Sequence, residues 1–189
     1  NITRTQAKKL AEKVNSGGYT SSLMFGIQWD LMLAFMQNKG GVDVTTLTND
    51  STNIGNYRNN KWSITNNKAK YSKDSGTSWN DGSYTKKEEG AVLLTTGASD
   101  SFAKMNIYDV AGNVVEWTLE GDQSGSTVGS NGVKLASLVN TQISPIRVAD
   151  TTAGSPCVSR GGVYGGIGSF FTASNRGGSG VGYYYDGVG

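Results

Sequence analysis

Hydrophobic residues repeat at helical spacing near the start of the chain. The spacing i, i+3, i+4, i+7 predicts a helix over residues 3–14. Thr3 and Gln6 fit a capping box, in which each side chain binds a free backbone amide of the first turn. The apolar residues that carry the repeat are Ala7, Leu10, Ala11 and Val14.

A second apolar pattern predicts a helix from about residue 26 to residue 38, ended by Gly40 and Gly41. This segment is apolar on nearly all sides, so we expect the helix to be well buried. The expected apolar stripe is formed by Ile27, Leu31, Ala34 and Phe35, widened by Leu33 and Met36.

Helical periodicity is weak in the rest of the chain. Residues 43–90 are polar and predict long loops, with Tyr57, Trp62 and Trp79 as buried aromatic anchors. The short apolar run 91–94 fits a helix or a strand. Further on, apolar residues predict strands at 114–119 and 158–164.

Composition narrows the classes of function. Gly is frequent (27 residues) and Pro is rare (2), which is typical of a loop-rich fold. A formal net charge of +2 predicts no strong attraction to nucleic acid or anionic membranes, and no apolar run is long enough for membrane insertion. The chain has one Cys and no His. It therefore has no internal disulfide, and zinc chemistry or Ser-His-Asp hydrolysis is disfavoured.

Three motifs follow one another along the chain. They are GIQWD at residues 26–30, NIYDVAGNVVEWT at 106–118, and SRGGVY at 159–164 followed by ASNR at 173–176 and YDGVG at 185–189. Together they resemble the formylglycine-generating-enzyme (sulfatase-modifying factor) family, which shows N-x-Y/F-D-L/V-x-G-N-V-x-E-W, then R-G-G and a final G-F-R. The last motif stops at Gly189, so we expect the family pattern to continue past the given residues.

The resemblance implies one domain over residues 1–189 with an α+β C-type lectin fold. We expect two helices on a small, mostly antiparallel sheet, with long irregular loops. Within the central motif, Gly112 permits a tight turn, and Asn113 and Glu116 tie loop backbone together. Trp117 and Tyr108 act as apolar anchors. As an alternative, Asn113 and Glu116 are weak candidates for calcium ligands, because carboxylate and amide oxygens suit that ion.

The enzymatic members of the family use a pair of cysteines near the C-terminus. This chain has only Cys157, which we expect to be a small buried hydrophobe. The resemblance therefore predicts the fold without the oxidase chemistry, and no catalytic residue or cofactor is assigned. A formylglycine-generating-type oxidase stays open as an alternative. Another is a surface module with one fixed carbohydrate or protein ligand.

The C-terminal segment, residues 161–189, has its own composition. It holds 11 of the 27 Gly and four of the nine Tyr, a mixture typical of antibody paratopes. It contains no Lys, Glu, Gln, Met or Trp, although residues 1–160 contain 30 of them. All codons for these five residue types end in a purine. An Asn codon that is randomised at its two adenines never yields them, and this is the signature of a diversity-generating retroelement. The alternative is a Gly- and Tyr-rich tail that has this composition by chance.

We therefore predict a variable, ligand-binding region at residues 161–189, on a protein that resembles retroelement-diversified variable proteins. Tyr183, Tyr184 and Tyr185 are the predicted hot spot, with strand packing as the alternative. Tyr164 serves either binding or the scaffold. The residues expected to be fixed are Arg160, Gly161, Gly162, Ala173, Arg176 (paired internally) and Gly187. The residues expected to be exposed and to contact ligand are Val163, Tyr164, Gly165, Gly166, Ile167, Ser169, Phe170, Asn175, Gly177, Gly178, Ser179, Val181, Tyr183, Tyr184, Tyr185 and Asp186.

This interpretation carries expectations about partners and location. The partner is a protein or glycan receptor on a cell or virion surface, and not nucleic acid. The protein itself is expected to be extracellular or on the surface of a virion or bacterium. An oligomer is compatible with the sequence, which indicates neither the ligand nor the origin.

Overall fold

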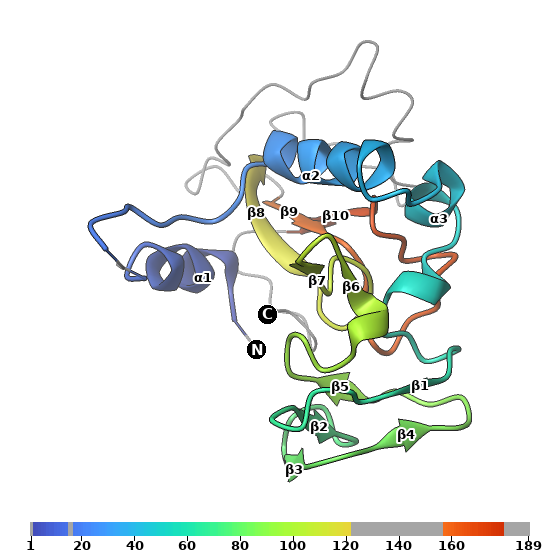
Figure 1. Cartoon of the computed structure of the whole chain (residues 1–189). Helices are drawn as coiled ribbons and strands as arrows, with labels where there is room; N and C mark the ends of the chain where they lie inside the picture. Colours follow the sequence, from blue (N-terminus) through green and yellow to red (C-terminus); the bar gives the residue numbers. More distant parts are fainter. Residues whose placement is uncertain (1, 15–16, 122–156, 180–189) are drawn as a thin grey trace.

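The computed structural model describes residues 2–14, 17–121 and 157–179 (Figure 1). Its helices are α1 (Arg4–Ala11), α2 (Gly26–Asn38) and α3 (Val44–Thr48), with short 3-10 turns η1 (Thr52–Ile54) and η2 (Asp100–Phe102). The strands are β1 (Trp62–Ser63), β2 (Lys70–Ser72), β3 (Asn80–Asp81), β4 (Thr85–Lys86), β5 (Leu93–Leu94), β6 (Ala103–Lys104), β7 (Ile107–Tyr108), β8 (Glu116–Gly121), β9 (Cys157–Arg160) and β10 (Arg176–Ser179). Among these described elements, no helix is long and apolar enough to cross a membrane.

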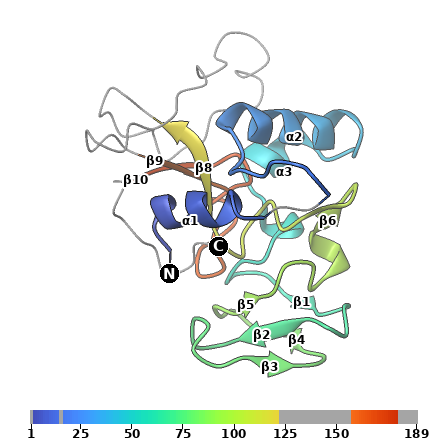
Figure 2. The same ribbon diagram turned by 90° about the vertical axis from the view of Figure 1, so that its left-hand side faces the viewer.

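The strands pair in four small antiparallel groups. The sheet that positions the site has the order β10-β9-β8, and α2 lies over it (Figure 1). The orders β3-β2-β5, β1-β4 and β6-β7 account for the other pairs, and β1 to β5 gather at the opposite end of the molecule from α2 (Figures 1 and 2). The fold is thus α+β, with few helices, small antiparallel sheets and long connections.

Helix α1 begins as predicted. The Thr3 side chain accepts a hydrogen bond from the Gln6 amide, and the Gln6 side chain accepts one from the Thr3 amide, which confirms the capping box. The helix packs beside β8, where the Arg4 Nε donates to the carbonyl of Thr118 at 2.8 Å. A small core forms at this contact from Ala7, Trp117 and Cys157.

Helix α2 has the predicted bounds, but its predicted apolar face is only partly confirmed. Leu33 and Met36 are buried as predicted, whereas Leu31 is 62% exposed and Phe35 is 44% exposed. Trp29, which the predicted stripe did not include, completes the buried face, and the three residues pack in the main core with Leu47 and Tyr57, among others. When a helix is apolar on nearly all sides, its sequence does not indicate which face is buried. The rotation of α2 is set instead by Asp30, which forms ion pairs with Arg160 and Arg176 of the sheet.

The region 43–90 contains α3 and four short strands, so it is more regular than the predicted loops. Tyr57 and Trp62 are buried, as predicted, but Trp79 is 43% exposed and is not an anchor. A second core forms at this end of the molecule. It contains Trp62, Ile64, Ala69, Val92, Leu94, Ala98 and Phe102. The run 91–94 includes strand β5.

The predicted strands at 114–119 and 158–164 are shifted in the structure. Strand β8 begins at Glu116, and strand β9 ends at Arg160. Gly161 has φ +76°, a left-handed conformation that favours glycine and ends the strand. Its position also allows the Trp29 ring and the carbonyl of Val110 to approach closely. The chain therefore leaves the sheet one residue after Arg160 and forms a loop that returns at Arg176.

The central motif holds two distant segments together. Gly112 has φ +67°, and a Cβ there would lie 2.2 Å from the carbonyl oxygen of Asn56, so only glycine fits. The Asn113 amide oxygen accepts hydrogen bonds from the Leu94 backbone and from the Asn56 side chain, both at 3.0 Å. Asn113 thus has the predicted scaffold role. Trp117 is buried as predicted, whereas Tyr108 is 47% exposed and is not a core anchor.

Candidate ligand-binding site

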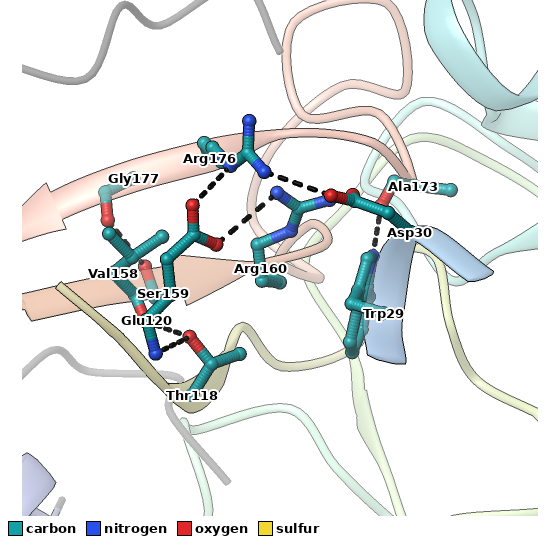
Figure 3. A network of polar contacts seen from close by, with 10 residues as sticks. All are labelled: Trp29, Asp30, Thr118, Glu120, Val158, Ser159, Arg160, Ala173, Arg176 and Gly177. Atoms are coloured by element: carbon teal, nitrogen blue, oxygen red, sulfur yellow. Dashed lines mark hydrogen bonds and ion pairs between the residues drawn. The ribbon is translucent and has the colours of Figure 1, made fainter. Parts of the chain in front are cut away.

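A closed ring of four buried charges lies at the base of the C-terminal segment (Figure 3). Arg176 contacts Asp30 at 2.9 Å and Glu120 at 2.7 Å. Arg160 contacts the other oxygen of Asp30 and lies 3.6 Å from Glu120. Each acid therefore bridges both arginines, and two positive charges balance two negative charges. The predicted internal pairing of Arg176 is confirmed.

The ring joins α2 to all three strands of the sheet. Asp30 comes from α2, Glu120 from β8, Arg160 from the end of β9 and Arg176 from the start of β10. All four side chains are nearly inaccessible, with at most 10% of the surface exposed. Burial, with the charge of Arg176, lowers the pKa of Arg160 to about 10, against the opposing effect of the two acids. Arg160 therefore stays charged at neutral pH, and the ring stays intact.

The GIQWD motif supplies the helix side of this arrangement. A Cβ at Gly26 would lie 2.2 Å from a carboxylate oxygen of Glu120, so glycine leaves room for that acid at the start of α2. Trp29 donates from Nε1 to the carbonyl of Ala173 at 3.0 Å, and Asp30 binds both arginines (Figure 3). The motif thus holds α2 against β9, β10 and the loop between them.

Arg160 and Arg176 face each other in the antiparallel register of β9 and β10. They enclose residues 161–175, hereafter loop 161–175. The two ends of this loop are therefore fixed at one place by the charge ring. Inside the loop, the Asn175 side chain donates to the carbonyl of Gly161 at 3.3 Å, which closes its base.

The frame holds loop 161–175 mainly by backbone atoms of the loop. The amide of Tyr164 donates to the carbonyl of Asn113 at 2.8 Å. The carbonyls of Gly166 and Gly168 each accept a hydrogen bond at 3.0 Å, from the backbone amides of Arg58 and Ser51. These contacts use main-chain atoms, so they do not depend on which side chains the exposed positions of the loop carry.

The second half of loop 161–175 is held in the same way. The Tyr57 hydroxyl donates to the carbonyl of Phe171, and burial raises the pKa of this phenol, which keeps it a donor. The amide of Ala173 donates to the Ser51 hydroxyl at 2.8 Å, and the amide of Ser174 donates to the carbonyl of Leu47 at 3.0 Å. The main chain is therefore fixed along its length.

Several side chains of loop 161–175 project away from this frame. Phe170 is 71% exposed, and Gly165 and Ser169 are also exposed. Val163 and Ile167 are half-buried. The predicted exposure is confirmed for Gly165, Ser169 and Phe170, whereas Val163 and Ile167 are only partly exposed. Phe171 is 38% exposed and was not among the predicted contact residues, although it follows Phe170 directly.

Three of the predicted contact positions are buried. Asn175 is buried because its amide closes the base of the loop, and Gly166 is buried because its main chain contacts Arg58. Tyr164 is only 6% exposed, and its hydroxyl donates to the Ser75 hydroxyl at 2.9 Å. Of its two expected roles, the buried position gives Tyr164 that of scaffold.

The other predicted contact positions lie in β10 or beyond. Gly177 is half-buried in β10, and Gly178 and Ser179 continue the strand. The remaining positions lie outside the described residues, so their exposure stays a prediction. They are Val181, Tyr183, Tyr184, Tyr185 and Asp186, together with the predicted scaffold residue Gly187.

The two calcium candidates differ in their surroundings. The amide oxygen of Asn113 already accepts two hydrogen bonds, which leaves it no lone pair for a cation. Glu116 is half-buried, and its burial together with the charge of Asp109 raises its pKa to about 7. No cluster of three or more acidic or Cys side chains suited to a metal ion occurs among the described residues. Asn113 is therefore a scaffold residue and not a metal ligand.

Cys157 is fully buried in β9, beside Ala7 and Trp117, as predicted for a small hydrophobe. Burial raises the pKa of its thiol. A thiol that is to attack a substrate or bind copper must meet its partner as an accessible thiolate. Neither condition holds at Cys157 in this structure.

Comparisons with known proteins do not assign the chain to a family. No family model matches the chain, and no curated protein matches it either. Among solved structures, variable protein 1 of Treponema denticola is similar, with a TM-score of 0.48 and 15% sequence identity. The match covers 100% of this chain and 68% of the other. The function is therefore argued from the residues of this chain.

Proposed function

We propose that this chain is a non-catalytic ligand-binding protein, of the retroelement-diversified type, with a C-type lectin fold. Its binding surface is the C-terminal segment, and its partner is a protein or glycan receptor outside the cell, on a cell or virion surface. The observation that carries the proposal is that loop 161–175 is held by its main chain. Such a loop keeps its shape while its outward side chains differ.

The composition of residues 161–189 supports the same proposal independently. The residue types that adenine randomisation of an Asn codon cannot produce are missing from the segment. The exposed positions Gly165, Ser169 and Phe170 carry residues that this randomisation can produce. Tyr183 to Tyr185 extend the proposed surface by sequence alone, and aromatic residues of this kind dominate many binding interfaces.

The charge ring explains how the proposed surface is kept rigid. A binding loop gains affinity when its conformation is fixed before the ligand arrives, because less entropy is lost on binding. Asp30 and Glu120 lie outside the C-terminal segment and fix Arg160 and Arg176 at its base. Diversification of the exposed positions leaves these contacts untouched.

Sequencing the 3′ end of the gene in related isolates tests the proposal. We expect substitutions at the codons of residues 163, 165, 167, 169 and 170, confined to positions where a template copy carries adenine. The codons of Arg160, Gly162, Ala173 and Arg176 should stay fixed. A template repeat and a reverse transcriptase gene should lie nearby. Substitutions scattered evenly over the chain would contradict the diversified reading.

The oxidase alternative has its own test. The protein is incubated with copper, oxygen and a Cys-containing peptide, and the peptide is analysed by mass spectrometry. We expect no aldehyde product, because Cys157 is inaccessible and has no cysteine partner. Turnover of the peptide would contradict the non-catalytic proposal.

A further inference from the structure

A hollow lined largely by polar side chains lies outside loop 161–175. Its volume is about 680 Å³, and it is open to solvent, because all its lining side chains are exposed. Residues from three segments line it, at 65–67, 96–100 and 108, and none comes from loop 161–175. The side chains of Thr65, Asn66, Asn67, Thr96, Asp100 and Tyr108 form the lining, with Gly97 between them.

The walls of the hollow are fixed to each other. The amides of Thr65 and Asn66 both donate to the carbonyl of Ala98, at 3.0 and 3.2 Å. The Asn66 side chain donates to the carbonyl of Gly97 at 3.1 Å, and the amide of Asp100 donates to the Thr65 hydroxyl at 2.9 Å. Four hydrogen bonds thus join the two lining segments, so the hollow is formed before any ligand binds.

The third wall is the ring of Tyr108. Gly97 has φ +72°, and a Cβ there would lie 3.7 Å from the Tyr108 ring, so the ring lies beside this glycine. The next residue, Asp109, accepts a hydrogen bond from the Gly97 amide at 2.7 Å, which fixes the glycine relative to the ring. Because Tyr108 is 47% exposed, it presents aromatic surface to the hollow.

The polar side chains of the lining are uncharged, except for the carboxylate of Asp100. Within the described part of the chain, the side chains of Asn67, Thr96, Asp100 and Tyr108 make no internal hydrogen bond, and all four are exposed. An amide and hydroxyl groups both donate and accept, and a carboxylate accepts. No Lys or Arg lines the hollow, and Asp100 would repel an anion.

We propose that this hollow binds a neutral carbohydrate. A pyranose has one face of weakly positive C–H groups, which pack well against the negative face of an aromatic ring such as Tyr108. Its hydroxyl groups both donate and accept, and they match the amide, hydroxyl and carboxylate groups of Asn67, Thr96 and Asp100. The lining contains no residue of loop 161–175, so the site gives the protein a second, fixed specificity.

The experiment uses the whole chain labelled with ¹⁵N and a panel of neutral trisaccharides, namely maltotriose, cellotriose, xylotriose and N-acetylchitotriose. Sialyllactose is the anionic comparison. We expect at least one neutral sugar to shift the side-chain amide signals of Asn66 and Asn67, with sialyllactose having a weaker effect. Tyr108→Ala should lower the affinity at least tenfold, and Asp100→Asn should lower it several-fold.

Two further variants make the result interpretable. Thr96→Arg places a bulky side chain on the exposed rim and should abolish binding even if Tyr108→Ala disturbs folding. Phe170→Ala changes the proposed C-terminal surface and should leave sugar binding unchanged. The proposal is overturned if no neutral sugar shifts these signals at millimolar concentration. Equal losses for Phe170→Ala and Tyr108→Ala, or binding of a peptide in place of a sugar, would also overturn it. None of these outcomes bears on whether loop 161–175 is diversified.

Discussion

Arg160 and Arg176 lie opposite each other in the β9–β10 ladder, and both guanidinium groups contact the carboxylate of Asp30. Two like charges at this spacing repel, so the pair depends on the acids between them. Asp30→Asn keeps the shape of the side chain and removes the charge. We expect it to lower the free energy of unfolding by about 3–5 kcal/mol, because it leaves buried positive charge uncompensated.

Urea denaturation measures this loss, and the chain offers a matched control. Asp81 forms an ion pair with Lys70 at 3.1 Å, but its side chain is 79% exposed. Asp81→Asn should change stability by less than about 1 kcal/mol, as is usual for surface pairs. Equal effects of the two variants would show that the charge ring does not fix the sheet to α2.

Two glycines of loop 161–175 differ sharply in the space around them. A Cβ at Gly168 would lie 2.3 Å from the backbone amide nitrogen of Thr52, whereas a Cβ at Gly165 would meet nothing within 4 Å. Gly168→Ala should therefore cost about 1–3 kcal/mol, because backbone must move. Gly165→Ala should stay within about 0.5 kcal/mol of the parent. Thermal melting of both variants gives the comparison, and similar losses would contradict the described path of the loop.

Lys86 is a buried cation that donates hydrogen bonds to three backbone carbonyls. Its Nζ donates to the backbone oxygens of Tyr57 at 2.6 Å and of Arg58 and Asn60, each at 2.9 Å. Lys86→Met has a similar length but no donor, so three acceptors lose their partner. We expect a loss of about 2–4 kcal/mol in chemical denaturation. Lys87→Met, at the exposed neighbouring position, is the control and should be nearly neutral.

The raised pKa of Glu116 predicts how the free energy of unfolding depends on pH. Burial and the charge of Asp109 raise its pKa to about 7 in the folded state, above the ordinary value of 4.5 for a glutamate. Between these values the folded protein holds a proton that the unfolded chain has released. A rise in pH through this window therefore destabilises the fold.

Glu116→Gln removes that proton equilibrium. The variant should be more stable than the parent at pH 8, by an amount of order 2 kcal/mol, and equally stable near pH 4. Urea midpoints measured from pH 4 to pH 8 check this, with the exposed Glu88→Gln as control. An unchanged pH profile in Glu116→Gln would show that Glu116 titrates normally.

Local patterns in the sequence predict local structure well. The capping box of Thr3 and Gln6, the bounds of α2 and the scaffold role of Asn113 all follow from short-range spacing and turn chemistry. The internal pairing of Arg176 and the α+β class were expected from the resemblance of the motifs to a known family, and the few long helices from the Gly-rich composition.

The sequence could not indicate which residues far apart in the chain contact each other. Asp30 and Arg176 are far apart in the chain, and no periodicity links them. One signal was present, however. Asp30 is the only charged residue in α2, and a lone carboxylate between the apolar residues Trp29 and Leu31 indicates a buried ion pair. The orientation of α2 follows once Asp30 is placed inward, and this would have moved Leu31 and Phe35 to the outside.

The amino-acid composition of the loop also could not predict which of its side chains are exposed. Asn175 and Tyr164 are residue types common in binding surfaces, yet both are buried, because each forms a hydrogen bond within the frame. Composition describes the loop as a whole, while the role of each position depends on where its side chain points.

The proposed function requires a loop that is held by its backbone and free in its outward side chains. The most direct measurement is a saturation-mutagenesis scan of residues 161–179, displayed on yeast and scored for folding by protease resistance. Positions 163, 165, 167, 169 and 170 should accept most residues, whereas 162, 168, 173, 175 and 176 should accept few. Equal intolerance at both sets of positions would contradict the account.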